Sequence, residues 1–130
     1  MHSRSIVAAA ILTFTMCGVA NASPAKCSSM YKELVSLQER AVAIQTSQAE
    51  QEEIFRIHDD ARANARGELQ NLSMNISSDF SREELEGMIA EHHEKAEAAK
   101  STLNALNAEA LEVSPAYKQK AESFNTECTS

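Results

Sequence analysis

The chain has 130 residues, with 12 basic and 19 acidic side chains and a formal net charge of −7. This is the length of a single domain, and the acidic balance argues against nucleic acid and anionic membrane surfaces, because both reward patches of Lys and Arg. The same balance suits a soluble protein or one with a basic partner.

Residues 1–22 have the pattern of a secretory signal peptide. Arg4 supplies a positive charge, residues 6–14 form a short apolar core, and Ala20 and Ala22 are the small residues before a cleavage site. The apolar core is too short for a membrane span, and polar sequence follows it directly. We therefore expect cleavage after Ala22 and a secreted protein, either extracellular or, in a bacterium, periplasmic.

The remaining residues, 23–130, are expected to form one domain with a net charge of −8 and two cysteines, since Cys17 falls in the leader. Cys27 and Cys128 are equally far from position 77.5, which lies in the polar segment 73–81. If the chain folds back there, residue i faces approximately residue 155 − i, and the cysteines meet. An even number of cysteines in an oxidising compartment favours a disulfide, either within one chain or between two antiparallel chains of a homodimer.

The first long helix is predicted over residues 25–72. This segment lacks proline, and its apolar or small residues recur at spacings of three and four, as on one face of a helix. A capping-box pattern at 47–50 leaves open a break near Ser47, although the absence of Gly and Pro there favours continuity. The middle of the stripe is polar, with Gln48, Gln51, His58 and Arg62.

A second helical region begins at residue 82 with a clear start signal. Ser81 and Glu84 fit a capping box, and Phe80 and Leu85 occupy the two positions of a hydrophobic staple. A heptad rhythm of apolar and small residues follows for about four repeats. This rhythm predicts a helix that packs along its whole length against a partner helix.

Pro115 interrupts that rhythm. Because proline lacks the N–H that continues a helix, we expect two helices here, 82–112 and 115–127, with Ser114 as the N-cap of the second.

The predicted fold class is all-α, an antiparallel helical hairpin or a small three- or four-helix bundle. Several apolar residues beside the stripe would be partly exposed in a bare hairpin, and a bundle or a homodimer would cover them: Val35, Val42, Ile54, Ile57 and Leu111.

The histidines are the candidates for a metal site. The fold-back rule sets His58 opposite Glu97, and His93 and Glu97 are four residues apart, hence on one helical face. The competing interpretation is that residues 91–94 form solvated helix surface, with His92 against alanines. No HExxH-type spacing supports the metal site.

Asn75 begins an Asn-Ile-Ser acceptor pattern at the expected turn, and it is a glycosylation site if the source is a eukaryote. The chain has no Gly-rich phosphate loop, no GxSxG elbow and no CxxC, so we expect neither an enzyme nor a bound cofactor.

The function these patterns favour is an exported, non-enzymatic helical module that binds another protein through its leftover apolar flank. An effector, an inhibitor and a chaperone-like binder all fit this description. The alternative is a carrier, either of a metal through His58, His93 and Glu97 or of a small apolar ligand in a bundle cavity.

Overall fold

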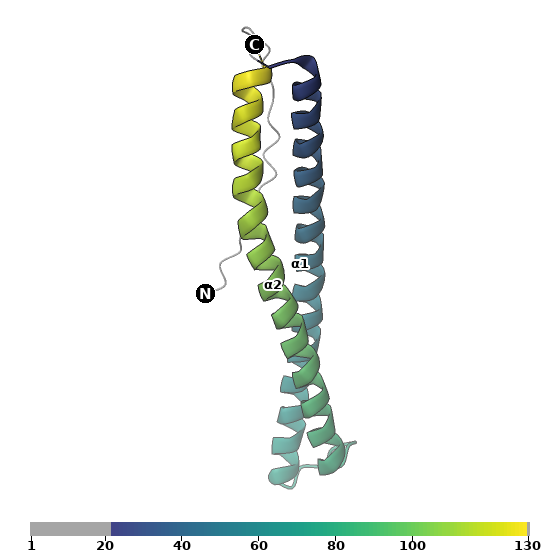
Figure 1. Cartoon of the computed structure of the whole chain (residues 1–130). Helices are drawn as coiled ribbons and strands as arrows, with labels where there is room; N and C mark the ends of the chain where they lie inside the picture. The colour runs from purple at the N-terminus through teal and green to yellow at the C-terminus, as the bar shows by residue number, and fades with distance from the viewer. Residues whose placement is uncertain (1–21, 130) are drawn as a thin grey trace. The chain divides into compact units, whose positions relative to one another are not determined.

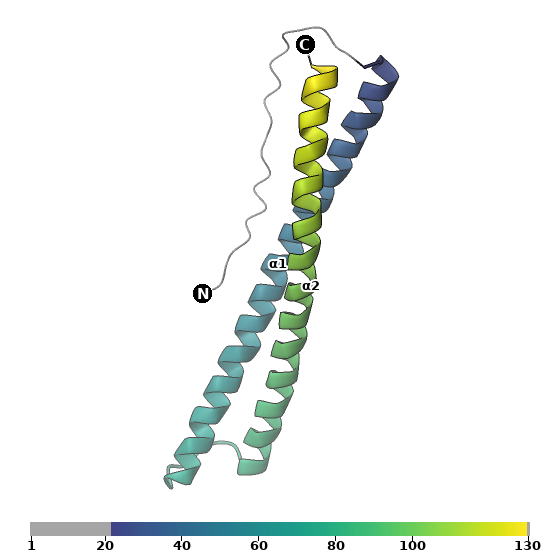
Figure 2. The same ribbon diagram turned by 60° about the vertical axis from the view of Figure 1, so that its left-hand side comes forward.

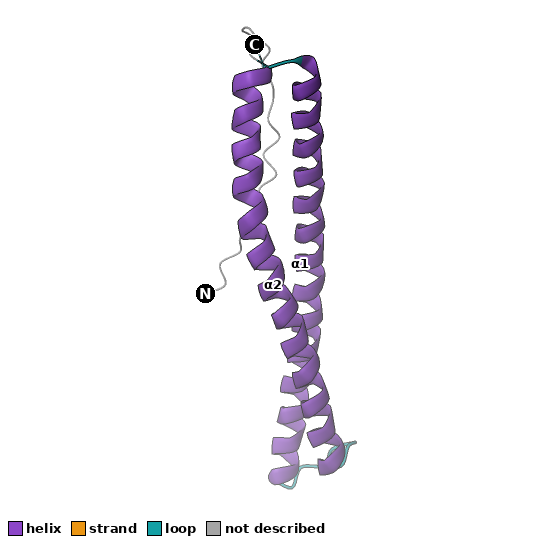
Figure 3. Ribbon diagram, viewed as in Figure 1, coloured by secondary structure: helices purple, strands orange, loops and turns teal. Residues whose placement is uncertain are grey.

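A computed structural model describes residues 22–129, which consist of two helices joined by one turn (Figures 1 and 3). Helix α1 spans Pro24–Ser73 and helix α2 spans Arg82–Cys128. No strand occurs in this part of the chain. The all-α fold class and the helical hairpin are confirmed. The expected leader, apart from Ala22, lies outside the described residues.

The chain divides into two compact units, each containing a stretch of both helices. Unit 1 includes residues 22–47 and 106–129, and unit 2 is 48–105. Within each unit the two stretches run in opposite directions, as the colours in Figures 1 and 2 show. Helix α1 continues through Ser47, so the capping-box pattern there does not start a new helix.

Helix α1 begins with a local capping arrangement at Ser23. The Ser23 hydroxyl accepts a hydrogen bond from the Lys26 backbone N–H at 3.2 Å, and the Ser23 carbonyl accepts one from the Cys27 N–H at 3.0 Å. Pro24 stands at the first helical position, where its missing N–H costs no helical hydrogen bond. This short segment therefore fixes the start of the helix that carries Cys27.

The core of unit 1 is built from aliphatic side chains of both helices. Leu37 and Leu106 pack against its four buried members, which are Ala41, Ile44, Ala110 and Val113. The fold-back rule placed Ile44 opposite Leu111, and that pairing is wrong, because Leu111 is 69% exposed. Ile44 instead clusters with Ala110 and Val113, which lie on the heptad stripe that faces α1.

The predicted break at Pro115 is also wrong, because α2 runs through it without interruption. Proline removes the hydrogen bond to the carbonyl four residues earlier, which belongs to Leu111. Both Pro115 and Leu111 are exposed, so water can reach that carbonyl. On the opposite face Val113 is 1% exposed and Ala121 is buried, and this packing on both sides of the proline holds the helix together.

The core of unit 2 is made of smaller residues. Leu85 is fully buried, and the other buried apolar residues of the unit are Ala65, Ala96 and Ala99. Alanines let two helices approach closely but bury little apolar area in each layer. Leu85 is therefore the one large, fully enclosed side chain among the described residues of this unit.

The turn between the helices has defined hydrogen bonds at both ends. At the end of α1, Asn75 adopts φ 60°, the Ile76 N–H donates to the Asn71 carbonyl and the Asn75 N–H donates to Leu72, which together form a Schellman motif. At the start of α2 the predicted capping box is present: the Glu84 N–H donates to the Ser81 hydroxyl at 3.1 Å, and the Ser81 N–H donates to the Glu84 carboxylate at 3.4 Å.

Candidate functional site

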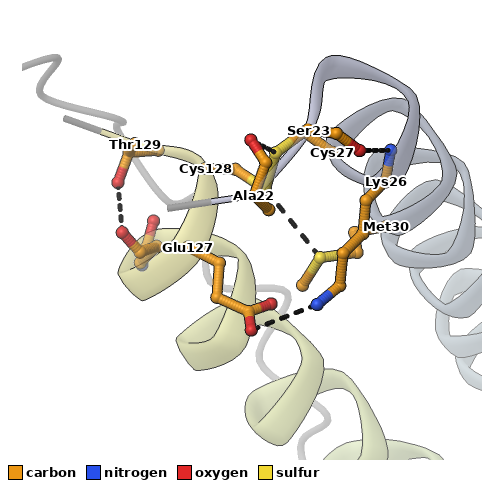
Figure 4. Close-up of a disulfide and its surroundings, with 9 residues drawn as sticks. Ala22, Ser23, Lys26, Cys27, Met30, Glu127, Cys128 and Thr129 are labelled. Carbon is orange, nitrogen blue, oxygen red and sulfur yellow. Dashed lines mark hydrogen bonds and ion pairs between the residues drawn. A yellow bond between two sulfur atoms is a disulfide. The ribbon is translucent and has the colours of Figure 1, made fainter. Parts of the chain in front are cut away.

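Cys27 and Cys128 are joined by a disulfide in unit 1, with Cα atoms 5.6 Å apart (Figure 4). The Met30 thioether lies 3.8 Å from the Cys128 sulfur, and Lys26 forms an ion pair with Glu127 at 3.3 Å. Bonded sulfurs offer no thiolate for catalysis or metal binding. The arrangement therefore has a structural role and closes a loop of 101 residues.

Unit 1 is further tied together by contacts between its two helical stretches. Arg40 reaches Glu109 at 2.9 Å, and Lys120 reaches Glu33 at 2.5 Å. The rings of Tyr31 and Phe124 lie 6.3 Å apart, as the fold-back rule predicts. Each exposed ion pair contributes at most about 1 kcal/mol, so the buried aliphatic cluster and the disulfide are the main contributors to stability here.

The residues of the proposed metal site do not come together. His58 meets His92, not Glu97 or His93, and their Nδ1 atoms are 2.9 Å apart. The Nδ1 of His93 instead accepts a hydrogen bond from Arg62 at 2.6 Å. In residues 22–129 no group of three or more His, Cys, Asp or Glu side chains is placed to hold a metal ion.

Sequence reasoning placed His92 against alanines and so missed its contact with His58. The spacing offered one usable signal: His92 lies on the same heptad stripe as Ala96 and Ala99, whereas His93 lies one position off it. A residue on the stripe faces the partner helix, and His58 is on the corresponding stripe of α1. Position on the heptad stripe therefore predicts the partner of His58 better than the fold-back rule does.

The turn presents three large apolar side chains to solvent: Met74 is 56% exposed, Ile76 is 49% exposed and Phe80 is 40% exposed. We call these three residues the turn surface. Turns normally expose polar side chains, so three apolar ones within seven residues form a local concentration. Sequence reasoning treated this segment only as a polar connection, although the apolar residues were visible in it.

Hydrogen bonds hold the turn in one conformation. The Ser78 hydroxyl donates to Glu68 at 2.7 Å and accepts from the Phe80 N–H at 3.3 Å. The Arg82 guanidinium donates to the Ser73 hydroxyl at 3.4 Å. A turn fixed in this way loses less conformational entropy on binding than a flexible one.

A small pocket adjoins the turn surface. Its lining residues come from α1, α2 and the segment before α2, and they are Ala61, Asn64, Ala65, Glu68, Phe80, Leu85 and Met88. Phe80 and Leu85, the predicted staple pair, both line it. Phe80 therefore belongs both to the turn surface and to the lining of this pocket.

Acidic charge is concentrated in unit 2. Its residues 48–105 carry six basic and thirteen acidic side chains, a net charge of −7. The described residues of unit 1, 22–47 and 106–129, carry five basic and six acidic side chains, a net charge of −1. Four exposed carboxylates flank the turn surface: Asp79, Glu83, Glu84 and Glu86. Glu83 and Glu84 also stand in the first turn of α2, where negative charge favours the helix dipole.

The asparagine of the glycosylation pattern lies between two residues of the turn surface. Asn75, Ile76 and Ser77 are all exposed, and Asn75 holds the left-handed conformation that ends α1. A glycan on Asn75 would stand between Met74 and Ile76.

The flank residues named from the sequence have mixed surroundings. Val35 and Ile54 are half-buried, while Val42, Ile57 and Leu111 are exposed. Because α1 continues through position 47, no third helix covers them in the described part of the chain. They remain surface residues of two different units and do not form one defined site.

Comparisons with protein-family models, curated proteins and solved structures find no match for this chain. Neither helix, over the residues that the structure describes, has an apolar run sufficient to cross a bilayer.

Proposed function

We propose that this chain is an exported, non-enzymatic helical module that binds a basic partner protein through the turn surface of unit 2. The observation that carries the proposal is the combination of Met74, Ile76 and Phe80 on a hydrogen-bonded turn. Apolar contact supplies affinity, and the surrounding carboxylates supply attraction for a partner of opposite charge.

Two features support export. Residues 1–22 have the charge, apolar core and small residues of a cleavable leader. A disulfide between Cys27 and Cys128 persists in oxidising compartments and is rare in the cytosol. Both features are independent of the turn surface.

The charge distribution supports a basic partner. Unit 2 carries almost all of the net negative charge, and its exposed apolar residues at the turn are flanked by carboxylates. Attraction between opposite charges raises the rate of association and weakens as salt screens it. Binding at the turn surface should therefore be salt-sensitive, unlike purely apolar association.

Site-specific photo-crosslinking tests the proposal. A photo-reactive residue is placed at Ile76 in the turn surface and, as a matched control, at Ile57, which is 48% exposed in the same unit. After incubation with the fluid into which the protein is exported, we expect a crosslinked protein of basic isoelectric point from position 76 and not from 57. The crosslinked fraction should fall as the salt concentration rises.

Substitution gives the complementary measurement. Phe80→Ser should reduce capture at least tenfold, because loss of a central apolar contact removes more than about 1.4 kcal/mol of binding free energy. Leu111→Ser, which alters an exposed residue of unit 1, should leave capture unchanged. Equal crosslinking from 76 and 57, or capture that survives Phe80→Ser, would contradict the proposal.

A further inference from the structure

We infer that His58 and His92 form a two-histidine chelate for a divalent transition-metal ion such as Cu²⁺ or Ni²⁺. The inference goes beyond the proposed function and does not depend on it. The two rings come from different helices of unit 2, and their centroids are 5.2 Å apart. Both side chains are half-buried, so each is partly accessible to water.

The separation of the two ring nitrogens suits a metal ion. The Nδ1 atoms of His58 and His92 are 2.9 Å apart. Metal–imidazole bonds are about 2.0–2.1 Å long, so two such bonds with this separation enclose an angle of about 90°. Neighbouring ligands in square-planar and octahedral complexes make this angle, whereas tetrahedral zinc needs about 3.3 Å between the nitrogens. The geometry therefore favours Cu²⁺ or Ni²⁺ over Zn²⁺.

The positions that the ring hydrogens of His58 and His92 can occupy are also compatible with a bound metal ion. Without the ion, one Nδ1 carries a hydrogen and donates it to the other. When each neutral ring carries its hydrogen on Nε2 instead, both Nδ1 lone pairs become available. Small rotations of the rings about their side-chain bonds then direct both lone pairs at a shared point, and no net proton release is required.

The charged neighbours of the pair are engaged with other side chains. The guanidinium of Arg62 is engaged by the Asp59 carboxylate and by the Nδ1 of His93. Glu91 forms an ion pair with Lys95 at 2.7 Å.

Two protein ligands define the expected strength of the site. Since residues 22–129 gather no third His, Cys, Asp or Glu around an ion, water completes the coordination. Such a site exchanges its ion readily and differs from the closed four-ligand sites that determine a fold. Its effect is to link α1 to α2 within unit 2, where the core is made of small residues.

Thermal unfolding of the full chain with Cu²⁺, Ni²⁺ or Zn²⁺ tests the inference. We expect Cu²⁺ and Ni²⁺ to raise the midpoint temperature of unfolding by about 5 °C when the metal concentration is roughly ten times the dissociation constant. Zn²⁺ should raise it less. His58→Ala and His92→Phe should abolish the metal-induced rise in midpoint temperature. The His92→Phe substitution keeps an aromatic ring at that position. His93→Ala, which alters the neighbouring histidine, is the matched control and should keep the rise.

Electron paramagnetic resonance of the Cu²⁺ complex gives a readout independent of stability. Coupling to two imidazole nitrogens is expected in the wild-type chain and to one in His92→Phe. A wild-type midpoint that no metal raises would overturn the inference. A rise that persists in both His58→Ala and His92→Phe would do the same, because the ion would then be bound elsewhere.

Discussion

The two units contain stretches of the same two helices but connect them by different chemistry. In unit 1 the helices are joined by a disulfide, an aliphatic cluster and three ion pairs that cross from one helix to the other. In unit 2 the described ion pairs stay within single helices. Two polar contacts between α1 and α2 involve histidines, and the Arg82–Ser73 hydrogen bond joins the helices beside the turn. The two helices of unit 1 are thus connected by many contacts of different kinds, whereas those of unit 2 are connected by a few specific residues.

Charge follows the same division. Unit 1 is nearly neutral, so opposite charges are available on both helices to pair across the seam. Unit 2 carries an excess of seven negative charges, and these repel one another across any pairing of its helices. A protein keeps such an excess where charge serves recognition, which is consistent with the turn surface lying in unit 2.

Removal of the disulfide should have the largest effect. Replacing Cys27 and Cys128 by serine frees a 101-residue loop in the unfolded chain, and the free energy of unfolding should fall by up to about 4 kcal/mol. Denaturant unfolding followed by circular dichroism measures this change. Hydrogen exchange should show the loss of protection first in unit 1. Faster exchange confined to unit 2 would contradict the division between the units.

Truncation of Leu85 should be the next largest effect. Leu85→Ala removes the one large, fully buried side chain of unit 2 and should cost about 3 kcal/mol of unfolding free energy. Val113→Ala in unit 1 should cost about 2 kcal/mol, because fewer buried carbons are lost and neighbouring aliphatic residues remain. The exposed Leu111→Ala is the control and should change stability by less than about 0.5 kcal/mol.

Replacement of the proline in α2 should raise the unfolding free energy, unlike the substitutions above. Pro115→Ala restores the N–H that can bond to the Leu111 carbonyl, so stability should rise by about 1–3 kcal/mol. The urea midpoint should increase with an unchanged slope. Pro24→Ala is a matched control at the first helical position, where the N–H has no helical partner, and it should have little effect. A destabilised Pro115→Ala variant would show that the helix needs proline there.

Much of this architecture could be predicted from the sequence because local signals and the heptad rhythm agree. The capping box at Ser81 and the Tyr31–Phe124 contact were predictable in this way. The break at Pro115 was wrong because local propensity cannot register that packing on the buried face of α2 holds the helix across an exposed proline. The His58–His92 contact was missed because a numerical fold-back rule carries an error of several residues, more than one helical turn.

The smallest expected effect concerns the ion pairs within helices of unit 2. The Lys95 hydrogen bond lowers the pKa of Glu91 below its ordinary value of 4.5, so the ionised form is favoured in the folded chain. A depressed folded-state pKa adds stability above pH 4.5, and that contribution disappears as the pH falls through the folded value. Glu91→Gln should therefore be slightly less stable than wild type at neutral pH and equally stable in acid.

The pKa of Glu53 is lowered in the same way, by its hydrogen bond with Arg56. Glu53→Gln should show the same small difference and the same loss in acid, since the Glu53–Arg56 pair also lies within a single helix, α1, and is exposed to salt. Urea unfolding at several pH values measures both variants. If either difference persisted below the folded-state pKa, the carboxylate charge would not be its source. The stability of unit 2 would then depend on another property of these side chains, such as their packing along the helix surface.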